Sequence, residues 1–401
     1  MADFPRSDYS NKDVKRAGEI IAGNMLWTKE KDSEIREAFR IANSWRDAHA
    51  FPMRSIRCSL IWYMRNLDIN GITAARLKRM PAIRRKLARI GLGLNQIQDL
   101  GGCRAILDTM ENVRSIVQIL QQRGRHEIRR EDNYIEKPKD DGYRSHHVIL
   151  AFKGNSDETS VFDGRRIELQ LRTRMQHSWA TAVEAVGLFR GEELKNHAGS
   201  QEWLRLFEAM SGEIAEAEGC PVHPEWADAT KRRANIRELA GSLKALAFLE
   251  HVRQGVKGTD LPMSPGYFPS HYMIRFDHAT KTVSVEPFNQ PLQATQSYDD
   301  AESFQRKEES ENIVLVEVSK LENLKLAYPN YFGDVGYFES QLQRVVRGQP
   351  AQEFSRVPVK QRAWKPEPAA DPKWIGHNPF PRREPNLRKN RAARERANKK
   401  A

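Results

Sequence analysis

The chain has 401 residues, of which 39% are hydrophobic, and this is enough for two or three domains with buried cores. Its formal net charge of +12 favours a polyanionic partner, either a nucleotide or an RNA. No apolar run approaches the ~20 residues that cross a bilayer, and the start lacks the apolar core of a signal peptide, so we expect a cytoplasmic protein. The three cysteines lie too far apart to predict a disulfide framework or a zinc site.

The first predicted elements lead into a cationic stretch. Apolar residues at spacings of three and four predict an amphipathic helix over residues 29–50. A second apolar segment, residues 56–67, leads to the many cations of residues 76–89. A charge run of this kind is, by itself, typical of a solvated helix face.

A carboxylate comes next, just before a strand that glycines interrupt. Residues 97–107 predict a short strand in which Gly101 and Gly102 let a ligand or a backbone approach closely, and Asp99 precedes them. An aspartate before two glycines is, on its own, more typical of a turn. A helix is predicted over residues 111–123, with a basic loop over residues 123–130.

A turn and a second carboxylate follow. The Pro, Asp and Gly content of residues 137–147 predicts a turn, after which a strand is predicted over residues 147–152. Polar and apolar residues alternate along a second strand, residues 166–173, which on its own could be a half-exposed strand. Its polar face carries Glu168, Gln170 and Arg172. Two carboxylates with a turn and several cations between them are a common way to assemble a Mg-phosphate site.

Three motifs together resemble the synthetase domain of the RelA/SpoT family, over roughly residues 55–190. They are Asp99-Leu-Gly-Gly-Cys-Arg104, Lys139-Asp-Asp-Gly-Tyr143 and Glu168-Leu-Gln-Leu-Arg-Thr173, and a helix with His177, Trp179 and Glu184 follows them. The resemblance implies a mixed-sheet, nucleotidyltransferase-like α/β domain flanked by helices. It also implies an enzyme that transfers the β,γ-pyrophosphate of ATP to a ribose 3′-hydroxyl with the help of Mg²⁺.

The resemblance further implies a role for each site residue. Asp99 and Glu168 would hold Mg²⁺, and Glu168 would be the general base that a weakly nucleophilic ribose hydroxyl requires. The residues implied to bind ATP are Lys78, Lys86 and Arg89 at the phosphates and Arg76 and Arg104 at adenine. Those implied to bind the acceptor are Arg130, Lys139, Tyr143, His147, Gln170 and His177. Tyr143 would stack on the acceptor base, an interaction that tolerates different bases.

The chain departs from the family pattern at Ala82, His146 and His177, where the family often has Ser, Leu and Asn. The first departure implies the loss of one hydrogen bond to an ATP phosphate. The other two are expected on the acceptor side of the site.

The second half of the chain predicts helices and then a small α/β module. Apolar stripes predict helices over residues 202–216 and 225–254, and the spacing of Gly and Pro predicts a linker over residues 255–269. The elements predicted for the module are a hairpin over residues 272–288, a polar loop, a strand over residues 312–318, a short helix and a last helix capped by Asp334.

The module contains Tyr328-Pro-Asn-Tyr331 and no cysteine pair. In this the whole chain resembles the CapRel type of fused toxin and antitoxin, in which a C-terminal pseudo-zinc-finger inserts two tyrosines at the ATP site and a phage structural protein is the trigger. The resemblance implies that Tyr328 and Tyr331 are regulatory. A buried Tyr-Pro turn would have the same sequence.

We therefore expect a chain of five parts. They are an N-terminal helical segment (1–54), the synthetase domain (55–190), a helical connection (191–258), a small regulatory α/β domain (259–348) and a disordered basic tail (349–401). The tail is predicted because prolines alternate there with charges, and because residues 382–401 contain nine Lys and Arg against two Glu.

Three functions are open at this point. If the chain resembles CapRel, the acceptor is the 3′-terminal adenosine of tRNA, and the protein is a translation-blocking toxin of phage defence. If it resembles the housekeeping small synthetases, the acceptor is GDP or GTP and the product belongs to guanosine tetraphosphate metabolism. A third hypothesis, an inactive nucleotide-binding module, is disfavoured by the intact Asp99, Tyr143 and Glu168.

Overall fold

The structure is a computed structural model. It describes residues 4–23, 31–192, 194, 199–255, 257–258, 269–277, 279–280, 282–304, 311–318, 321–332 and 334–355, all of which belong to one unit, Phe4–Ser355. Most of the predicted linker and all of the predicted tail after Ser355 lie outside the described residues. Within the described ranges, none of the helices combines the length and apolar character that crossing a membrane requires.

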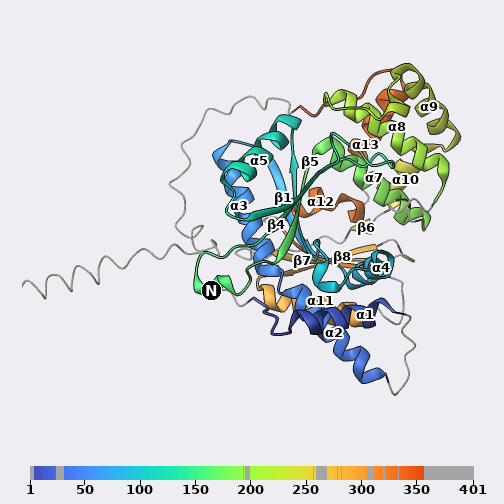
Figure 1. Cartoon of the computed structure of the whole chain (residues 1–401). Coiled ribbons are helices and arrows are strands. Elements are labelled where there is room, and N and C mark those ends of the chain that lie inside the picture. The colour runs from blue at the N-terminus through green and yellow to red at the C-terminus, as the bar shows by residue number, and fades with distance from the viewer. Residues whose placement is uncertain are drawn as a thin grey trace, which may run out of the picture. The chain divides into compact units, whose positions relative to one another are not determined.

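A mixed sheet forms the centre of the fold (Figure 1). In sequence order its strands are β1 (Gly71–Leu77), β2 (Gly101–Leu107), β3 (Glu127–Asn133), β4 (His146–Ala151), β5 (Arg166–Thr173), β6 (Lys257–Gly258), β7 (His271–Asp277), β8 (Thr282–Phe288) and β9 (Glu311–Glu317). The described strands are arranged in the order β3-β4-β5-β2-β1-β9-β7-β8-β6. The pairs β2 with β5 and β6 with β8 are parallel, and the other pairs are antiparallel.

The strands of the expected C-terminal module therefore continue the sheet of the synthetase segment. The junction is short: Ala75 of β1 is opposite Glu317 of β9, and Arg76 is opposite Val316. The hairpin β7–β8 and the strand β9 confirm the strands predicted there. The boundaries proposed between the parts of the chain stay a prediction, although the mixed α/β class is confirmed.

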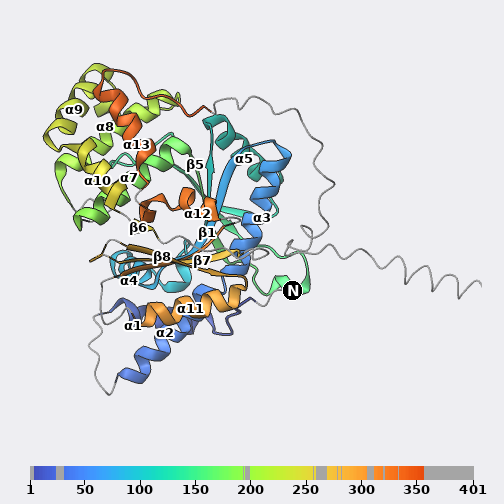
Figure 2. The ribbon, with the colours of Figure 1, turned by 180° about the vertical axis from the view of Figure 1, so that it is seen from behind.

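Helices cover both faces of the sheet because strands such as β4 and β9 are apolar and buried on both sides. On one face lie α3 (Ala50–Asn66), α5 (Met110–Arg123) and α11 (Pro291–Phe304), which Figure 2 shows beneath β7 and β8. On the other face lie α7 (Arg174–Arg190), α12 (Leu321–Ala327) and the short η5 (Pro329–Phe332). The core beneath α12 joins β1 and β2 to β7 and β9, so this face is continuous across the junction.

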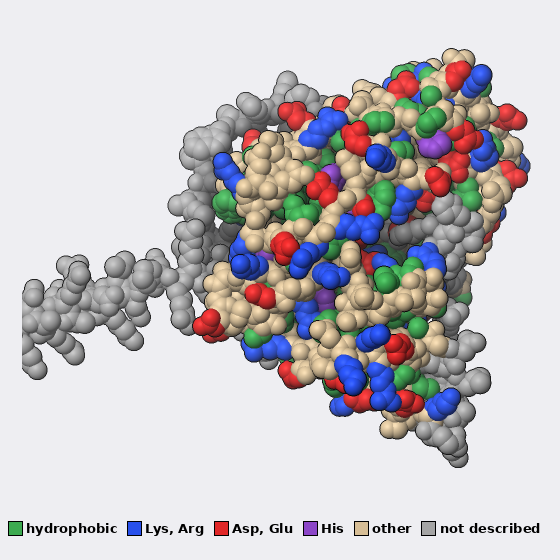
Figure 3. Space-filling view, viewed as in Figure 1, with side chains coloured by type: hydrophobic (Ala, Val, Ile, Leu, Met, Phe, Trp, Pro, Cys, Tyr) green, Lys and Arg blue, Asp and Glu red, His purple; other side chains and the backbone are tan. Residues whose placement is uncertain are grey.

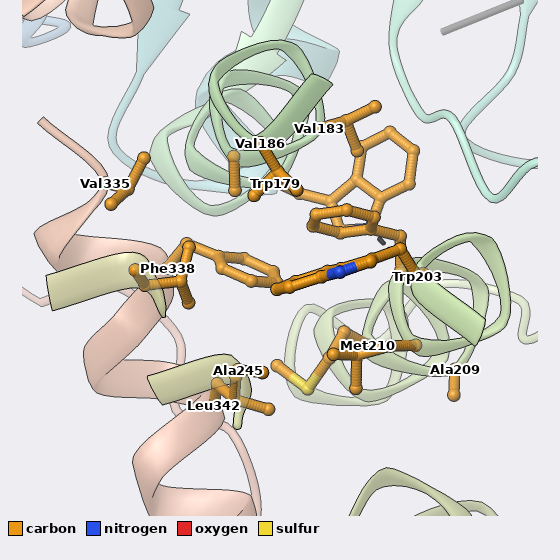
Figure 4. Close-up of a cluster of buried hydrophobic side chains, with 14 of the residues drawn as sticks. Trp179, Val183, Val186, Trp203, Ala209, Met210, Ala245, Val335, Phe338 and Leu342 are labelled. Atoms are coloured by element: carbon orange, nitrogen blue, oxygen red, sulfur yellow. Dashed lines mark hydrogen bonds between the residues drawn. The ribbon is translucent and has the colours of Figure 1, made fainter. Parts of the chain in front are cut away.

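Two further groups of helices pack beside the sheet. The helices α1 (Asn11–Ala22) and α2 (Asp32–Asp47) share a core with α4 (Met80–Ile90) and η1 (Leu94–Gln96). The helices α8 (Gln201–Ala217), α9 (Ala229–Ser242), α10 (Ala245–Gly255) and α13 (Gly336–Val346) pack with α7 around Trp179, Trp203 and Phe338 (Figure 4). Two short turns, α6 (Asp157–Ser160) and η3 (Pro224–Trp226), complete the described helices.

Four predicted elements differ from the structure in their type, their number or their cap. The second half of the basic loop predicted over residues 123–130 is the start of strand β3, because residues 127–133 pair with β4 despite their charges. The polar loop after the hairpin is helix α11, whose buried residues Ala294, Tyr298 and Ala301 repeat at helical spacing. The segment 225–254 is two helices, because Lys244 adopts a φ of 48° between them. The last helix begins after Val335, and Asp334 does not cap it.

Candidate active site

The register of three neighbouring strands brings the predicted site residues onto one face of the sheet. Arg76 of β1, Gly102 of β2 and Glu168 of β5 are directly opposite one another. The next row contains Arg104, Gln170 and His147. A Cβ built on Gly102 would come no closer than 3.8 Å to Arg76 O and 3.9 Å to Glu168 O. Because Gly102 has no side chain, β2 places no side chain between Arg76 and Glu168 at this position.

Five side chains on this face form a closed ring of hydrogen bonds. Glu168 Oε1 lies 3.1 Å from His147 Nδ1, and His147 Nε2 lies 2.8 Å from the hydroxyl of Tyr143. Arg172 Nη2 donates to the Tyr143 hydroxyl and, over 3.0 Å, to Gln170 Oε1. Gln170 Nε2 closes the ring by donating to Glu168 Oε2 over 2.7 Å. The Glu168 carboxylate and the Tyr143 hydroxyl are therefore connected on one side through His147 and on the other through Arg172 and Gln170.

The ring sets the protonation of its members. Burial raises the pKa of Glu168, but the hydrogen bonds and charges of His147, with Gln170 and Lys78, outweigh burial and bring the pKa to about 2. Burial likewise opposes the ionisation of Tyr143, yet Arg172 and His147 lower its pKa to about 8. Burial lowers the pKa of His147, and Tyr143 and Glu168 together raise it above its ordinary value. At neutral pH Glu168 is therefore ionised and able to bind a cation.

A second cluster joins Asp99 to the cations before and within α4. Lys78 Nζ lies 2.7 Å from Asp99 Oδ2, and Lys86 Nζ lies 3.0 Å from Asp99 Oδ1. Burial lowers the pKa of Lys78, and the contact with Asp99 opposes this. Because the charge of Lys78 also lowers the pKa of Glu168, Lys78 is an electrostatic neighbour of both carboxylates.

These two carboxylates have the chemistry of a magnesium site. Mg²⁺ is typically held by one or two protein carboxylates together with substrate phosphates. Asp99 and Glu168 are two such carboxylates, and both interact electrostatically with Lys78. In the described part of the chain, no group of three His, Cys, Asp or Glu side chains is arranged to hold a metal without a substrate. The donor set thus fits a metal that arrives with a nucleotide.

The two arginines expected at adenine lie against the C-terminal segment. The Tyr328 ring centroid lies 5.9 Å from the guanidinium carbon of Arg76 and 5.5 Å from that of Arg104. Arg104 Nη1 also donates to Ala327 O over 3.0 Å. Tyr328 and Tyr331 are both buried in the core that joins α12 and η5 to the sheet.

The remaining predicted residues belong neither to the hydrogen-bonded ring nor to the cluster around Asp99. Arg89 is exposed in the last turn of α4. Arg130 is exposed on β3, where its guanidinium pairs with Asp132. Lys139 Nζ lies 5.1 Å from the centroid of the Tyr143 ring, and His177 is buried in the first turn of α7. His146 was wrongly expected on the acceptor side: it alternates with His147 and contacts Glu131 on the opposite face of the sheet.

Two residues of the site were not among the predicted ones. Arg172 is 4% exposed and donates hydrogen bonds to Tyr143 and Gln170. Its place on the same strand face as Glu168 and Gln170 could have identified it as a site residue from the sequence. Tyr134 packs edge-on against His147 with ring centroids 5.2 Å apart, and Lys139 Nζ lies 4.6 Å from its ring. Nothing in the local pattern distinguished Tyr134 from a strand-end aromatic.

Comparison with known proteins gives a family for this region. Residues 75–191 match the model described as the region found in RelA / SpoT proteins. The chain is 27% identical over 157 residues to the GTP pyrophosphokinase YjbM of Bacillus subtilis, a match that covers 36% of this chain and 72% of that protein. It is 30% identical over 115 residues to the GTP pyrophosphokinase YwaC of the same organism, a match that covers 27% of this chain and 54% of that protein.

Longer relatives match over the same part of the chain. The GTP pyrophosphokinase of Escherichia coli K12 is 25% identical over 148 residues, and the match spans about a fifth of that protein (19%) and 35% of this chain. Among solved structures, small alarmone synthetase 2 of Bacillus subtilis has a TM-score of 0.36 and 24% identity, covering 42% of this chain and 88% of that chain. What these comparisons show of this chain is that residues 75–191 match a region found in RelA / SpoT proteins.

Proposed function

We propose that this chain contains a RelA/SpoT synthetase domain and is an ATP-dependent pyrophosphokinase that transfers the β,γ-pyrophosphate of ATP to a ribose 3′-hydroxyl. The observation that carries the proposal is the closed ring through Glu168, His147, Tyr143, Arg172 and Gln170. It places an ionised carboxylate and an aromatic platform in one unit, beside a lysine that also contacts Asp99.

In this proposal each side of the ring serves one substrate. ATP lies toward Lys78 and Lys86, which neutralise its phosphates, and Asp99 and Glu168 hold the Mg²⁺ that arrives with it. When bound, the metal neutralises charge on the phosphate oxygens. The acceptor base stacks on Tyr143, which orients the 3′-hydroxyl toward Glu168. Glu168 takes the hydroxyl proton as the oxygen attacks the β-phosphorus, and AMP leaves.

For the acceptor we propose the 3′ end of tRNA, with GDP or GTP as the second candidate. The second candidate is favoured by the names of the relatives, which are GTP pyrophosphokinases. The first is supported by the position of Tyr328 against Arg76 and Arg104, as expected for the CapRel type. In that reading the protein is a self-inhibited toxin of phage defence that a phage structural protein activates.

One experiment tests the activity and separates the acceptors. The purified chain is incubated with Mg²⁺ and ATP labelled at the γ-phosphate, together with deacylated tRNA, GDP or GTP in parallel reactions. Label that enters tRNA, with AMP released in equal amount, supports the first acceptor, and labelled guanosine phosphates support the second. A chain that binds ATP and labels none of these acceptors, with Tyr328→Ala included to relieve inhibition, would support the inactive module.

A further inference from the structure

The helix α4 is capped by a residue from the other end of the chain. The backbone N–H of Met80, the first residue of α4, donates to Glu302 Oε1 of α11 over 2.7 Å. The N-cap residue of α4, Arg79, makes no side-chain capping hydrogen bond of its own. The first N–H groups of a helix have no partner within the helix, so an external acceptor stabilises this end. A carboxylate is favoured there because it also complements the helix dipole.

The capping carboxylate is itself held in one position. Arg46 Nη1 of α2 donates to Glu302 Oε2 over 2.8 Å, and the hydroxyl of Tyr298 donates to Glu302 Oε1 over 3.0 Å. Arg46, Tyr298 and Glu302 are all buried. Arg46 is shared with Asp47 and Asp299 of the same cluster. A buried charge that is paired on several sides is costly to disturb, so Glu302 is a rigid cap.

A second contact ties the same end of α4 to the C-terminal strands. Arg79 Nη1 donates to Asn312 Oδ1 of β9 over 2.7 Å. The end of α4 is therefore fixed by α11 and β9, whereas Met80, Ile83 and Leu87 pack its body on α1 and α2. Lys86, two turns along the same helix, makes the 3.0 Å contact with Asp99.

We propose that Glu302 is a positioning residue of the ATP site, acting through α4 on Lys86. This inference rests on the proposed function, since it takes α4 as the phosphate-binding helix. It divides the C-terminal region into two parts with different roles. The strands β7, β8 and β9 with α11 complete the synthetase, and the segment 321–332, with Tyr328 and Tyr331, covers it.

The test compares two variants of the same buried cluster in the full chain. Glu302→Ala removes the cap and its contact with Arg46. Asp299→Asn weakens the same arginine cluster, and no hydrogen bond in the described structure joins Asp299 to α4. Loss of a cap typically changes an equilibrium by about fivefold and by up to about thirtyfold, so Glu302→Ala is expected to weaken ATP binding by on the order of tenfold while the KM for the acceptor is unchanged. Asp299→Asn keeps a side-chain oxygen that can accept the hydrogen bond from Arg46, so this variant is expected to bind ATP within about twofold of the parent.

Hydrogen exchange supplies the local readout. In Glu302→Ala the peptide that contains residues 79–90 is expected to exchange faster, while peptides of β2 and β5 keep the rate of the parent. If Glu302→Ala does not fold, Tyr298→Phe replaces it, because this variant removes only one hydrogen bond to the Glu302 carboxylate. Tyr298→Phe is expected to weaken ATP binding and to speed exchange in residues 79–90, each by about two- to threefold. Unchanged ATP affinity and unchanged exchange in α4, in whichever of these variants folds, overturn the proposal.

The outcomes also separate this inference from the proposed function. If the parent transfers pyrophosphate but loss of the cap leaves ATP affinity unchanged, the inference fails and the function stands. If both the parent and Tyr328→Ala bind ATP and neither transfers pyrophosphate to tRNA, GDP or GTP, the function fails, and the effect of Glu302 on ATP binding is still measured.

Discussion

The ring of Tyr328 lies against the guanidinium of Arg104, with 5.5 Å between the ring centroid and Cζ, and Arg104 also donates a hydrogen bond to Ala327 O. Arg76 lies on the same ring at 5.9 Å. The two arginines that the family resemblance assigns to adenine are thus engaged by the chain itself. A flat ring held by two cations is a stable arrangement in a buried site, and adenine would compete for the same contacts.

We predict that Tyr328→Ala, alone or with Tyr331→Ala, raises the affinity for ATP. A desolvated cation–π contact contributes ~1 to 2 kcal/mol, so the gain is expected to be about fivefold or more, measured by calorimetric titration. Phe332→Ala is the matched control, because Phe332 packs at the edge of the same core without a ring contact to either arginine among the described interactions. Equal ATP affinity in the parent and the Tyr328 variant would show that the tyrosines are structural.

We predict that Glu168→Gln abolishes pyrophosphate transfer while ATP binding survives. The amide keeps the shape of the side chain but accepts a proton poorly and is a weak ligand for Mg²⁺, and loss of a general base typically costs about 10² to 10⁴ in rate. The measurement is the initial rate of AMP release with saturating acceptor. Glu131→Gln, whose carboxylate contacts His146 on the opposite face of the sheet, is expected to keep the rate of the parent. A Glu168 variant within about threefold of the parent would contradict the assignment.

We predict that Tyr143→Ala raises the KM for the acceptor and leaves ATP affinity almost unchanged. Loss of a stacked base costs about 1 to 3 kcal/mol, which corresponds to about 5- to 150-fold in acceptor binding. Tyr143→Phe keeps the platform but loses the hydroxyl that His147 and Arg172 share, so it is expected to fall between the parent and the Ala variant. A large loss of ATP affinity with normal acceptor binding would place the two substrates the other way round.

A fourth prediction concerns stability and pH. Glu218 is buried, accepts a hydrogen bond from Gln176 over 2.8 Å and contacts the hydroxyl of Thr173, the N-cap of α7. Burial raises the pKa of Glu218 from its ordinary value of 4.5 to about 7 despite these two hydrogen bonds. The folded state therefore binds one more proton than the unfolded state between these two values. The free energy of unfolding should fall as the pH rises through this window.

The variant Glu218→Gln removes this titration. Its amide can accept from Gln176 and donate to the Thr173 hydroxyl, so the geometry of the helix cap is retained. We expect a free energy of unfolding similar to that of the parent at pH 4.5, and one higher by on the order of 2 kcal/mol at pH 8. Urea unfolding at the two pH values measures the difference. A variant less stable than the parent at pH 8 would mean that the carboxylate is stabilised there as an anion.

Local patterning was sufficient for much of the site. The alternation along residues 166–173 predicted that Glu168, Gln170 and Arg172 share a face, because side chains in a strand alternate with a period of two, and the structure confirms the strand. The same rule separates His147 from His146. Helical spacing likewise predicted the buried stripe of α8, with Phe207 and Met210 in its core.

Other parts failed because local preference and tertiary pairing disagree. The charged residues 127–133 form β3, since the edge of a sheet supplies hydrogen bonds to any backbone that lies beside it and leaves charged side chains in water.

The net charge of the chain also did not locate a binding surface. On the face that Figure 3 shows, Lys and Arg are interspersed with Asp and Glu, so the net charge marks no single anion-binding surface there.

The contacts that couple the two ends of the chain have no local signature. Glu302 meets Met80 across 222 positions, and Arg104 meets Ala327 across 223. Residue type and spacing fix which side chains share a face of one element, because that depends only on the backbone repeat. Which element lies against that face depends on the order of strands in the sheet, and here β9 is inserted beside β1. The residues that share the face of the site were therefore predictable from the motifs. The cap on α4 and the contacts of Tyr328 with Arg76 and Arg104 instead arise from the topology that places the last strands next to the first.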